Sequence, residues 1–197
     1  MRSSSQGIKY EPAPVKEILA KIKNLTTLMV DLAYASLLSK DASLAKEVLK
    51  LESEVDVLSY RLQMSLMLIA RDAEDAASLQ SILRAAVATD KMSDAVGDIA
   101  QMVLEGMEIH PIIPEALQEL SEPIAFVPIA PGSPIGRKSL ASLKAETKMG
   151  ISILAIKRGD KLIVSPPLSD RISPGDVLIV RGARSGLEKL KKLSEEW

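Results

Sequence analysis

The chain has 197 residues, of which 47% are hydrophobic, 3% are aromatic and none is cysteine. This length allows one domain or two small ones, and the lack of cysteine excludes disulfides and thiolate metal sites. The net charge of −1 hides two unlike halves, since residues 1–120 carry 12 basic and 18 acidic side chains, whereas residues 121–197 carry 13 and 8. Such a division is typical of two modules with different electrostatic character.

Residues 1–14 are polar, contain Pro12 and Pro14, and are predicted to be a flexible lead. They lack the apolar core of a signal peptide, and no stretch approaches the roughly 20 apolar residues of a membrane-spanning helix. We therefore expect a cytoplasmic protein, peripheral to the membrane only through a partner. The basic charges of the second half are scattered and have few aromatic neighbours, so no nucleic-acid partner is predicted.

Residues 15–121 are predicted to form an antiparallel three-helix bundle. No glycine or proline occurs in the 82 residues from Val15 to Val96, and apolar residues recur there at spacings of three and four. The predicted helices cover residues 15–32, 44–69 and 82–103, with turns at residues 39–41 and 71–73. Gly106 is expected to close the third helix, residues 110–114 to form a break, and residues 115–120 a short helix.

Residues 122–197 are predicted to form a small α/β sandwich, which makes the whole chain an α+β protein with two domains. Strands are expected at residues 151–156, 161–164 and 177–180. The Gly159-Asp160 pair suits a type II′ hairpin, because glycine accepts a positive φ at the first turn position. Ser185-Gly-Leu-Glu188 has the spacing of a capping box and should open a helix that runs to Leu193.

Three segments of this second domain carry a family likeness: residues 133–140, which begin Ser133-Pro134-Ile135-Gly136, and residues 153–159 and 174–182. In their order they resemble the C-terminal ligand-sensing module of potassium-uptake regulators, the TrkA-C or RCK-C domain. The resemblance implies a module that pairs with a second copy and binds a small ligand. That family usually carries a nucleotide-binding Rossmann domain where this chain has helices, so NAD or ATP binding is not inherited.

Two segments of the helical half resemble the PhoU domain. Residues 51–58 are similar to the acidic motif of its second helix, and residues 90–100 to the Glu-Arg-Ile-Gly-Asp-His-Ala motif of its third. The second segment departs from that motif, with Asp90 for Glu, Lys91 for Arg, Ser93 for Gly and Ala95 for His. A full PhoU protein has two three-helix halves and this chain has one, so a symmetric dimer is one way to supply the second.

In the helical half, the carboxylate side chains are the residues that indicate a functional site. Glu52 and Asp56 lie four residues apart, as do Asp90, Asp94 and Asp98, so each set shares a helix face. Like charges at this spacing repel. PhoU domains bind metal at these positions, so the resemblance implies a metal site made by Glu52, Asp56, Asp90 and Asp94, suited to an oxygen-preferring ion such as Mg²⁺ or Mn²⁺. The alternative is a solvated acidic face, relieved by Lys91 or by arginines of a partner.

No catalytic residues are predicted, and the protein is not expected to be an enzyme. His110 is the single histidine and lies at a helix exit, where a hinge role is favoured. Residues 132–136 lack the Gly-Lys-Ser/Thr ending of a phosphate-binding loop. The second domain holds five arginines that could meet an anionic ligand of unknown identity: Arg137, Arg158, Arg171, Arg181 and Arg184. Scattered surface positions are the favoured interpretation, so no ligand-binding residue is assigned.

The sequence thus favours a homodimeric, soluble regulatory subunit of a potassium or other cation transport system. It would sense a small ligand through the second domain and signal to a membrane channel or transporter by a shift between two dimer arrangements. The alternative function is a PhoU-type metal-binding regulator of phosphate uptake.

Overall fold

The computed structural model describes residues 11–119, 122–143 and 145–195. These residues divide into two compact units, one built mainly from three long helices and the other around a four-stranded sheet, with residues 34–44 grouped in the second unit. The predicted α+β fold with two domains is therefore confirmed. Of the predicted flexible lead, residues 1–10 lie outside the described residues, and residues 11–14 have no regular secondary structure.

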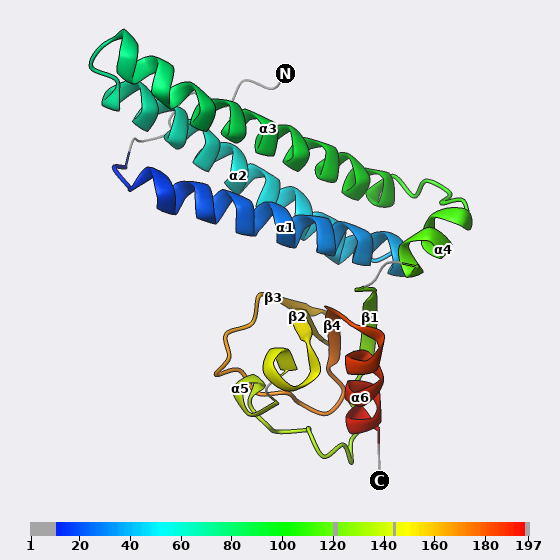
Figure 1. Cartoon of the computed structure of the whole chain (residues 1–197). Coiled ribbons are helices and arrows are strands. Elements are labelled where there is room, and N and C mark those ends of the chain that lie inside the picture. The colour runs from blue at the N-terminus through cyan, green and yellow to red at the C-terminus, as the bar shows by residue number, and fades with distance from the viewer. Residues whose placement is uncertain (1–10, 120–121, 144, 196–197) are drawn as a thin grey trace. The chain divides into compact units, whose positions relative to one another are not determined.

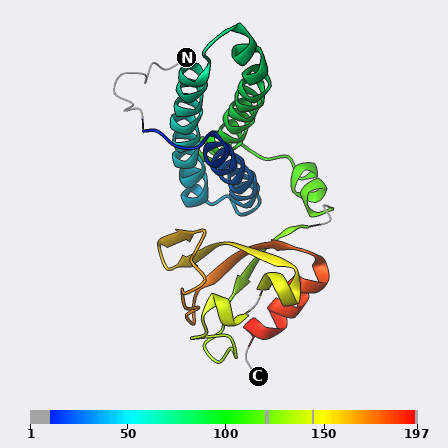
Figure 2. The same cartoon turned by 60° about the vertical axis from the view of Figure 1, so that its left-hand side comes forward.

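The helical unit consists of α1 (Val15–Ser39), α2 (Ala42–Ile69) and α3 (Ala73–Leu104), which run side by side in Figures 1 and 2. Both predicted turns are confirmed. Lys40 takes a left-handed φ of 53° between α1 and α2. Asp72 caps α3, and its carboxylate accepts hydrogen bonds from the backbone N–H groups of Glu74 at 3.0 Å and Asp75 at 2.9 Å. Connections this short require neighbouring helices to be antiparallel.

Aliphatic side chains from all three helices form the core of this unit, and α3 contributes unevenly to it. The buried residues of α3 are Ala86, Ser93, Val96, Gly97 and Ala100. Ser93 donates its hydroxyl to the sulfur of Met29 on α1 at 3.5 Å. From Ala73 to Ala85 α3 buries no residue, so this half of the helix is held less firmly than the half that follows. The buried apolar side chains of α1 and α2 include Ile22, Met29, Leu32, Val48, Val55 and Leu62.

Helix α4 (Ile112–Gln118) begins three residues earlier than predicted. Pro114 was expected to belong to a break but is the third residue of the helix. A proline is tolerated there because the first four N–H groups of a helix have no intrahelical acceptor. The predicted end at Leu120 lies outside the described residues.

The sheet has the strand order β1-β4-β2-β3, and every neighbouring pair is antiparallel. Its strands are β1 (Ile124–Pro128), β2 (Ile151–Arg158), β3 (Lys161–Val164) and β4 (Val177–Gly182). Helix α5 (Leu140–Leu143) and a π-helical turn, η1 (Ala145–Met149), connect β1 to β2. Helix α6 (Arg184–Ser194) packs against β1, β4 and η1 (Figure 2). Its buried Leu187 and Leu190 join the core of this unit.

The predicted hairpin is confirmed and the predicted capping box is wrong. β2 and β3 are joined by Gly159 and Asp160 alone, and Gly159 has a φ of +56°. Helix α6, however, begins at Arg184 after Ala183 in the N-cap position, so Ser185 lies inside the first turn. Strand β1 was not predicted, because Pro123 and Pro128 bound it. Prolines are tolerated there since β1 is an edge strand, paired on one side only.

An ion pair with a buried carboxylate closes the turn before β4. Arg158, at the end of β2, donates from Nε and Nη2 to the two carboxylate oxygens of Asp176 at 2.8 Å each. The side chain of Asp176 is 1% exposed and also accepts from the N–H of Ser173. This pair therefore fixes the predicted Pro174-Gly175-Asp176 turn against the hairpin.

Candidate functional site: a carboxylate cluster and an apolar groove on α2 and α3

Five carboxylates from α2 and α3, here called the carboxylate cluster, lie near one another: Glu52, Asp56, Asp90, Asp94 and Asp98. Gly97 allows the two helices to approach at this level. A Cβ built on Gly97 would lie 2.6 Å from the carboxylate carbon of Glu52, so the Glu52 side chain rests directly on the α3 backbone. The predicted shared faces are thus brought together by the packing of α2 on α3.

Burial and mutual repulsion raise the pKa values of three members. The pKa of Glu52 is raised by burial and then by the charges of Asp56, Asp94 and Asp98. Burial also raises the pKa of Asp56, with Asp90 and Asp94 adding to the effect. The pKa of Asp94 is raised by burial, by Asp90 and by Asp98. The charged forms of these three carboxylates are therefore disfavoured first by burial and then by their acidic neighbours.

No basic side chain in the described part of the chain forms an ion pair with the cluster, the predicted Lys91 included. One oxygen of Asp90, Oδ1, is buried and has no hydrogen-bond partner there. The relief proposed for a solvated acidic face therefore does not come from Lys91, and a cationic partner from outside the described residues would find this charge unopposed.

A metal ion would be a suitable cation by its chemistry, because carboxylate oxygens are the ligands that Mg²⁺ and Mn²⁺ prefer. The geometry is less suitable. In residues 11–119, 122–143 and 145–195, no three histidine, cysteine, aspartate or glutamate side chains converge closely enough to hold a metal ion. Metal binding by Glu52, Asp56, Asp90 and Asp94 stays a prediction that requires these side chains to move together.

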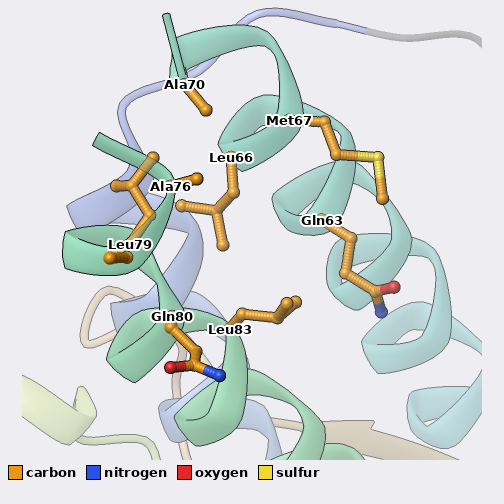
Figure 3. Close-up of a pocket in the computed structure, with 9 residues that line it drawn as sticks. Gln63, Leu66, Met67, Ala70, Ala76, Leu79, Gln80 and Leu83 are labelled. Carbon is orange, nitrogen blue, oxygen red and sulfur yellow. The ribbon is translucent and has the colours of Figure 1, made fainter. Parts of the chain in front are cut away.

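An apolar groove, which the sequence does not predict, lies between α2 and α3 near the turn that joins them. Its volume is about 380 Å³. Figure 3 shows Leu66 from α2 and Leu83 from α3 reaching into the space between the two helices. Met67 belongs to the groove but is 73% exposed. We call the following residues the apolar groove: Gln63, Leu66, Met67, Ala70, Ala76, Ala77, Leu79, Gln80 and Leu83.

Two of the five arginines considered for an anionic ligand have acidic neighbours. Arg158 is bound to Asp176, and Nε of Arg181 lies 3.5 Å from Oε2 of Glu122. Arg137 and Arg171 are exposed. His110 has a structural contact, since its Nδ1 accepts a hydrogen bond from the N–H of Ile112 at 3.3 Å, at the start of α4. That contact fits the predicted place at a helix exit.

Both domain resemblances are confirmed by comparison with family models. Residues 19–103 match the PhoU domain and residues 124–194 match the TrkA-C domain. Among the described residues, none of the helices combines the length and the apolar composition needed to cross a bilayer.

Two curated relatives are potassium transport proteins. The Ktr system potassium uptake protein C of Bacillus subtilis (strain 168) is 39% identical over 74 residues, which is 38% of this chain and 34% of that protein. Potassium channel protein 1 of Methanocaldococcus jannaschii is 28% identical over 194 residues, which is 92% of this chain and 56% of the relative. The chain thus spans about a third and about half of the length of these two proteins.

A solved structure of the RCK C domain of the potassium transport protein KtrA, in complex with cyclic diadenosine monophosphate, is also similar. It is 27% identical and covers 47% of this chain and 96% of its own, with a TM-score of 0.35.

Proposed function

Because the chain carries a PhoU domain followed by a TrkA-C domain, we propose that it is a regulatory subunit of a potassium or other cation transport system. The observation that carries the proposal is the alignment with an archaeal potassium channel protein, which extends over 92% of this chain and so includes both domains. The protein would act without catalysis, at the cytoplasmic face of a membrane channel or transporter.

The proposed signal is a small anionic ligand, which the TrkA-C domains of a homodimer bind. We call this ligand binding the input. The domain has an exposed strand edge on β1 and another on β3, and its size gives it a small core, so pairing would bury surface that one copy leaves open. A ligand that binds one dimer arrangement more tightly than another shifts the population toward it. The altered spacing of the two copies would be the signal to the membrane partner.

Ligand binding is tested on the full chain by titration calorimetry. Cyclic diadenosine monophosphate is the probe, because it is the ligand of the related domain of KtrA, and cyclic diguanosine monophosphate is the control. We expect the first nucleotide alone to bind. Calorimetry should give one ligand per two chains, and light scattering should show that the chain is a dimer. The double change Arg137→Gln with Arg171→Gln should weaken it, whereas Arg71→Gln with Arg84→Gln on the helical unit should not. A monomer that binds neither nucleotide contradicts the proposed input.

The output is tested in cells. Removal of the chain should change the uptake of rubidium, which replaces potassium in transport, and should leave phosphate uptake unchanged. The reverse result would contradict this proposal and favour the second candidate, a metal-binding regulator of phosphate uptake. That candidate is supported by the PhoU match to residues 19–103 and by the unneutralised carboxylate cluster.

A further inference from the structure

The apolar groove and the carboxylate cluster occupy one continuous face of the helical unit. Asp56 and Gln63 on α2 lie seven residues apart, and Ala70 follows by another seven directly after the end of the helix; on α3 the same spacing holds for Ala76, Leu83 and Asp90. Seven residues are close to two helical turns, so each series stays on one side of its helix. The groove at the turn between the helices therefore runs directly into the negatively charged part of the face.

This face has features that a solvent-exposed surface does not require. Its apolar part includes Met67, which is 73% exposed, and Val87, which follows Leu83 by four residues on α3 and is 39% exposed. Exposed apolar area beside a groove is a mark of binding surfaces. Its charged part is the carboxylate cluster, with which no basic side chain forms an ion pair in the described part of the chain.

We propose that this face binds an amphipathic helix of a partner protein, with apolar side chains in the groove and lysine or arginine side chains against the carboxylate cluster. Insertion of a helix between two helices is a common mode of peptide recognition, in which apolar residues at helical spacing provide the contact area. The cluster selects the sign of the neighbouring charge, since opposite potentials steer and orient the partner. Met67 suits such a surface because a methionine side chain adapts to different apolar neighbours.

A second copy of the same face is a poorer occupant. In a two-fold pairing, the cluster of one copy would lie either against the cluster of the other or against its apolar groove. The first arrangement adds like charges, and the second removes carboxylates from water with no partner. The basic residues nearest in sequence on α3, Arg84 and Lys91, are each exposed and do not reach the cluster of their own copy. The proposal is independent of the ligand of the TrkA-C domain.

The test uses the full chain and a fluorescent helical peptide of about 18 residues, long enough for about five turns. Leucines on one face of its first half match the groove, and lysines on the same face of its second half match the cluster. A control peptide has glutamate in place of each lysine. Fluorescence anisotropy is measured with a chelator present, so that metal ions do not compete for the carboxylates. We expect the basic peptide to bind and the acidic peptide not to bind.

Two pairs of variants locate the binding. Met67→Gln with Val87→Gln changes the apolar part of the face, and Asp56→Asn with Asp94→Asn changes the charged part. Each pair should weaken the basic peptide by about tenfold or more, as loss of contacts near the centre of an interface does. The matched control is Leu68→Gln with Ile69→Gln, because these residues are 66% and 49% exposed but do not line the groove. This control should leave the affinity unchanged.

The proposal is overturned if the acidic peptide binds as tightly as the basic one, or if the control variant weakens binding as much as Met67→Gln with Val87→Gln. It is also overturned if the latter pair converts a dimeric chain into a monomer by light scattering, since a second copy would then occupy the face. All the changed side chains are exposed, so the variants should keep the melting temperature of the parent chain within a few degrees.

Discussion

Glu52 on α2 lies against Gly97 on α3, and a Cβ at position 97 would come within 2.6 Å of the Glu52 carboxylate carbon. Gly97, the smallest residue of α3, thus lies at the point where α2 presents the carboxylate of Glu52. Because nothing larger than hydrogen projects from Gly97, the carboxylate is held next to Asp94 and Asp98, which precede and follow this glycine on α3. The charge density of the cluster depends on this contact.

The Gly97→Ala variant is expected to displace the Glu52 carboxylate with little change in stability. The new methyl group meets the end of a flexible side chain, which can move, and alanine is about 1 kcal/mol more favourable than glycine inside a helix. Gly186→Ala in α6 is the comparison, because its Cβ would meet the backbone of Met149, with the carbonyl carbon at 3.1 Å. That variant should lose about 1–3 kcal/mol. Urea unfolding of both variants measures the difference, and equal losses would contradict the contacts described.

The helical unit is expected to become more stable as the pH falls from 7 toward 4. Glu52, Asp56 and Asp94 have pKa values raised above their usual 4.5, 3.8 and 3.8, so the folded state takes up protons at a higher pH than the unfolded state. Their contribution is fully present below the usual values and is lost as the pH rises through the raised ones. Thermal unfolding at several pH values measures this. Asp56→Asn with Asp94→Asn should flatten the profile, and a variant with the parent's profile would argue against repulsion in the cluster.

Loss of the Arg158–Asp176 pair is expected to destabilise the TrkA-C domain. Arg158→Met leaves a carboxylate that is 1% exposed and that still accepts a hydrogen bond from the N–H of Ser173. Removing one partner of a buried ion pair costs about 3–5 kcal/mol, and the lower end applies because Arg158 is 43% exposed. Arg158→Lys should recover part of the loss, since it restores the charge but not the two-pronged geometry. Chemical unfolding followed by circular dichroism is the measurement, and an Arg158→Met variant as stable as the parent would show that the pair is dispensable.

Metal binding at the carboxylate cluster is tested by a separate pair of substitutions. If Glu52, Asp56, Asp90 and Asp94 bind Mg²⁺ or Mn²⁺, then Asp90→Asn with Asp94→Asn should lower the metal content by elemental analysis and remove any rise in melting temperature that the ion causes. Without metal binding, the same change should stabilise the helices by a few tenths of a kcal/mol, because repulsion at the four-residue spacing is relieved. A melting temperature that divalent ions do not alter would decide against the metal site.

The predicted boundary near residue 122 is tested with two fragments. Residues 1–121 should give an almost wholly helical circular dichroism spectrum, and residues 122–197 a spectrum with strong strand content. This follows if the three helices and the sheet each form their own core, as the buried clusters of each unit suggest. A fragment of residues 1–121 with strong strand signal, or one that does not fold, would contradict a boundary at this position.

The helices and the β2–β3 hairpin were predictable because their signals are local. No glycine or proline interrupts the helical spacing of apolar residues between Val15 and Val96, and the Gly159-Asp160 pair forms the hairpin turn. Each of these signals acts between residues close in sequence. Strand β1 was not predictable in this way, because Pro123 and Pro128 oppose a strand locally and only the pairing with β4 reveals that it is an edge. The capping-box prediction was wrong because a matching spacing at residues 185–188 does not by itself determine where the helix begins.

For the candidate site, the spacing of the carboxylates predicted which of them share a helix face, and only the resemblance to the PhoU domain implied that the two faces meet. That depends on the register of α2 against α3, which the contact between Glu52 and Gly97 sets. The apolar groove was missed because its residues fit the pattern of an ordinary core. Leu66 and Leu83 repeat at helical spacing whether or not another element covers them, so the groove beside them appears only in the structure.

The sparse burial of α3 before Ala86 also bears on how this unit moves. Segments with few buried contacts open locally at a lower free-energy cost than the rest of a domain. Backbone amide protons in the first turns of α3 should therefore exchange with deuterium sooner than those near Val96 and Ala100. The groove lies on this loosely held end, so a bound helix would slow that exchange, and the end of the bundle that opens most easily would become an indicator of whether the partner is present.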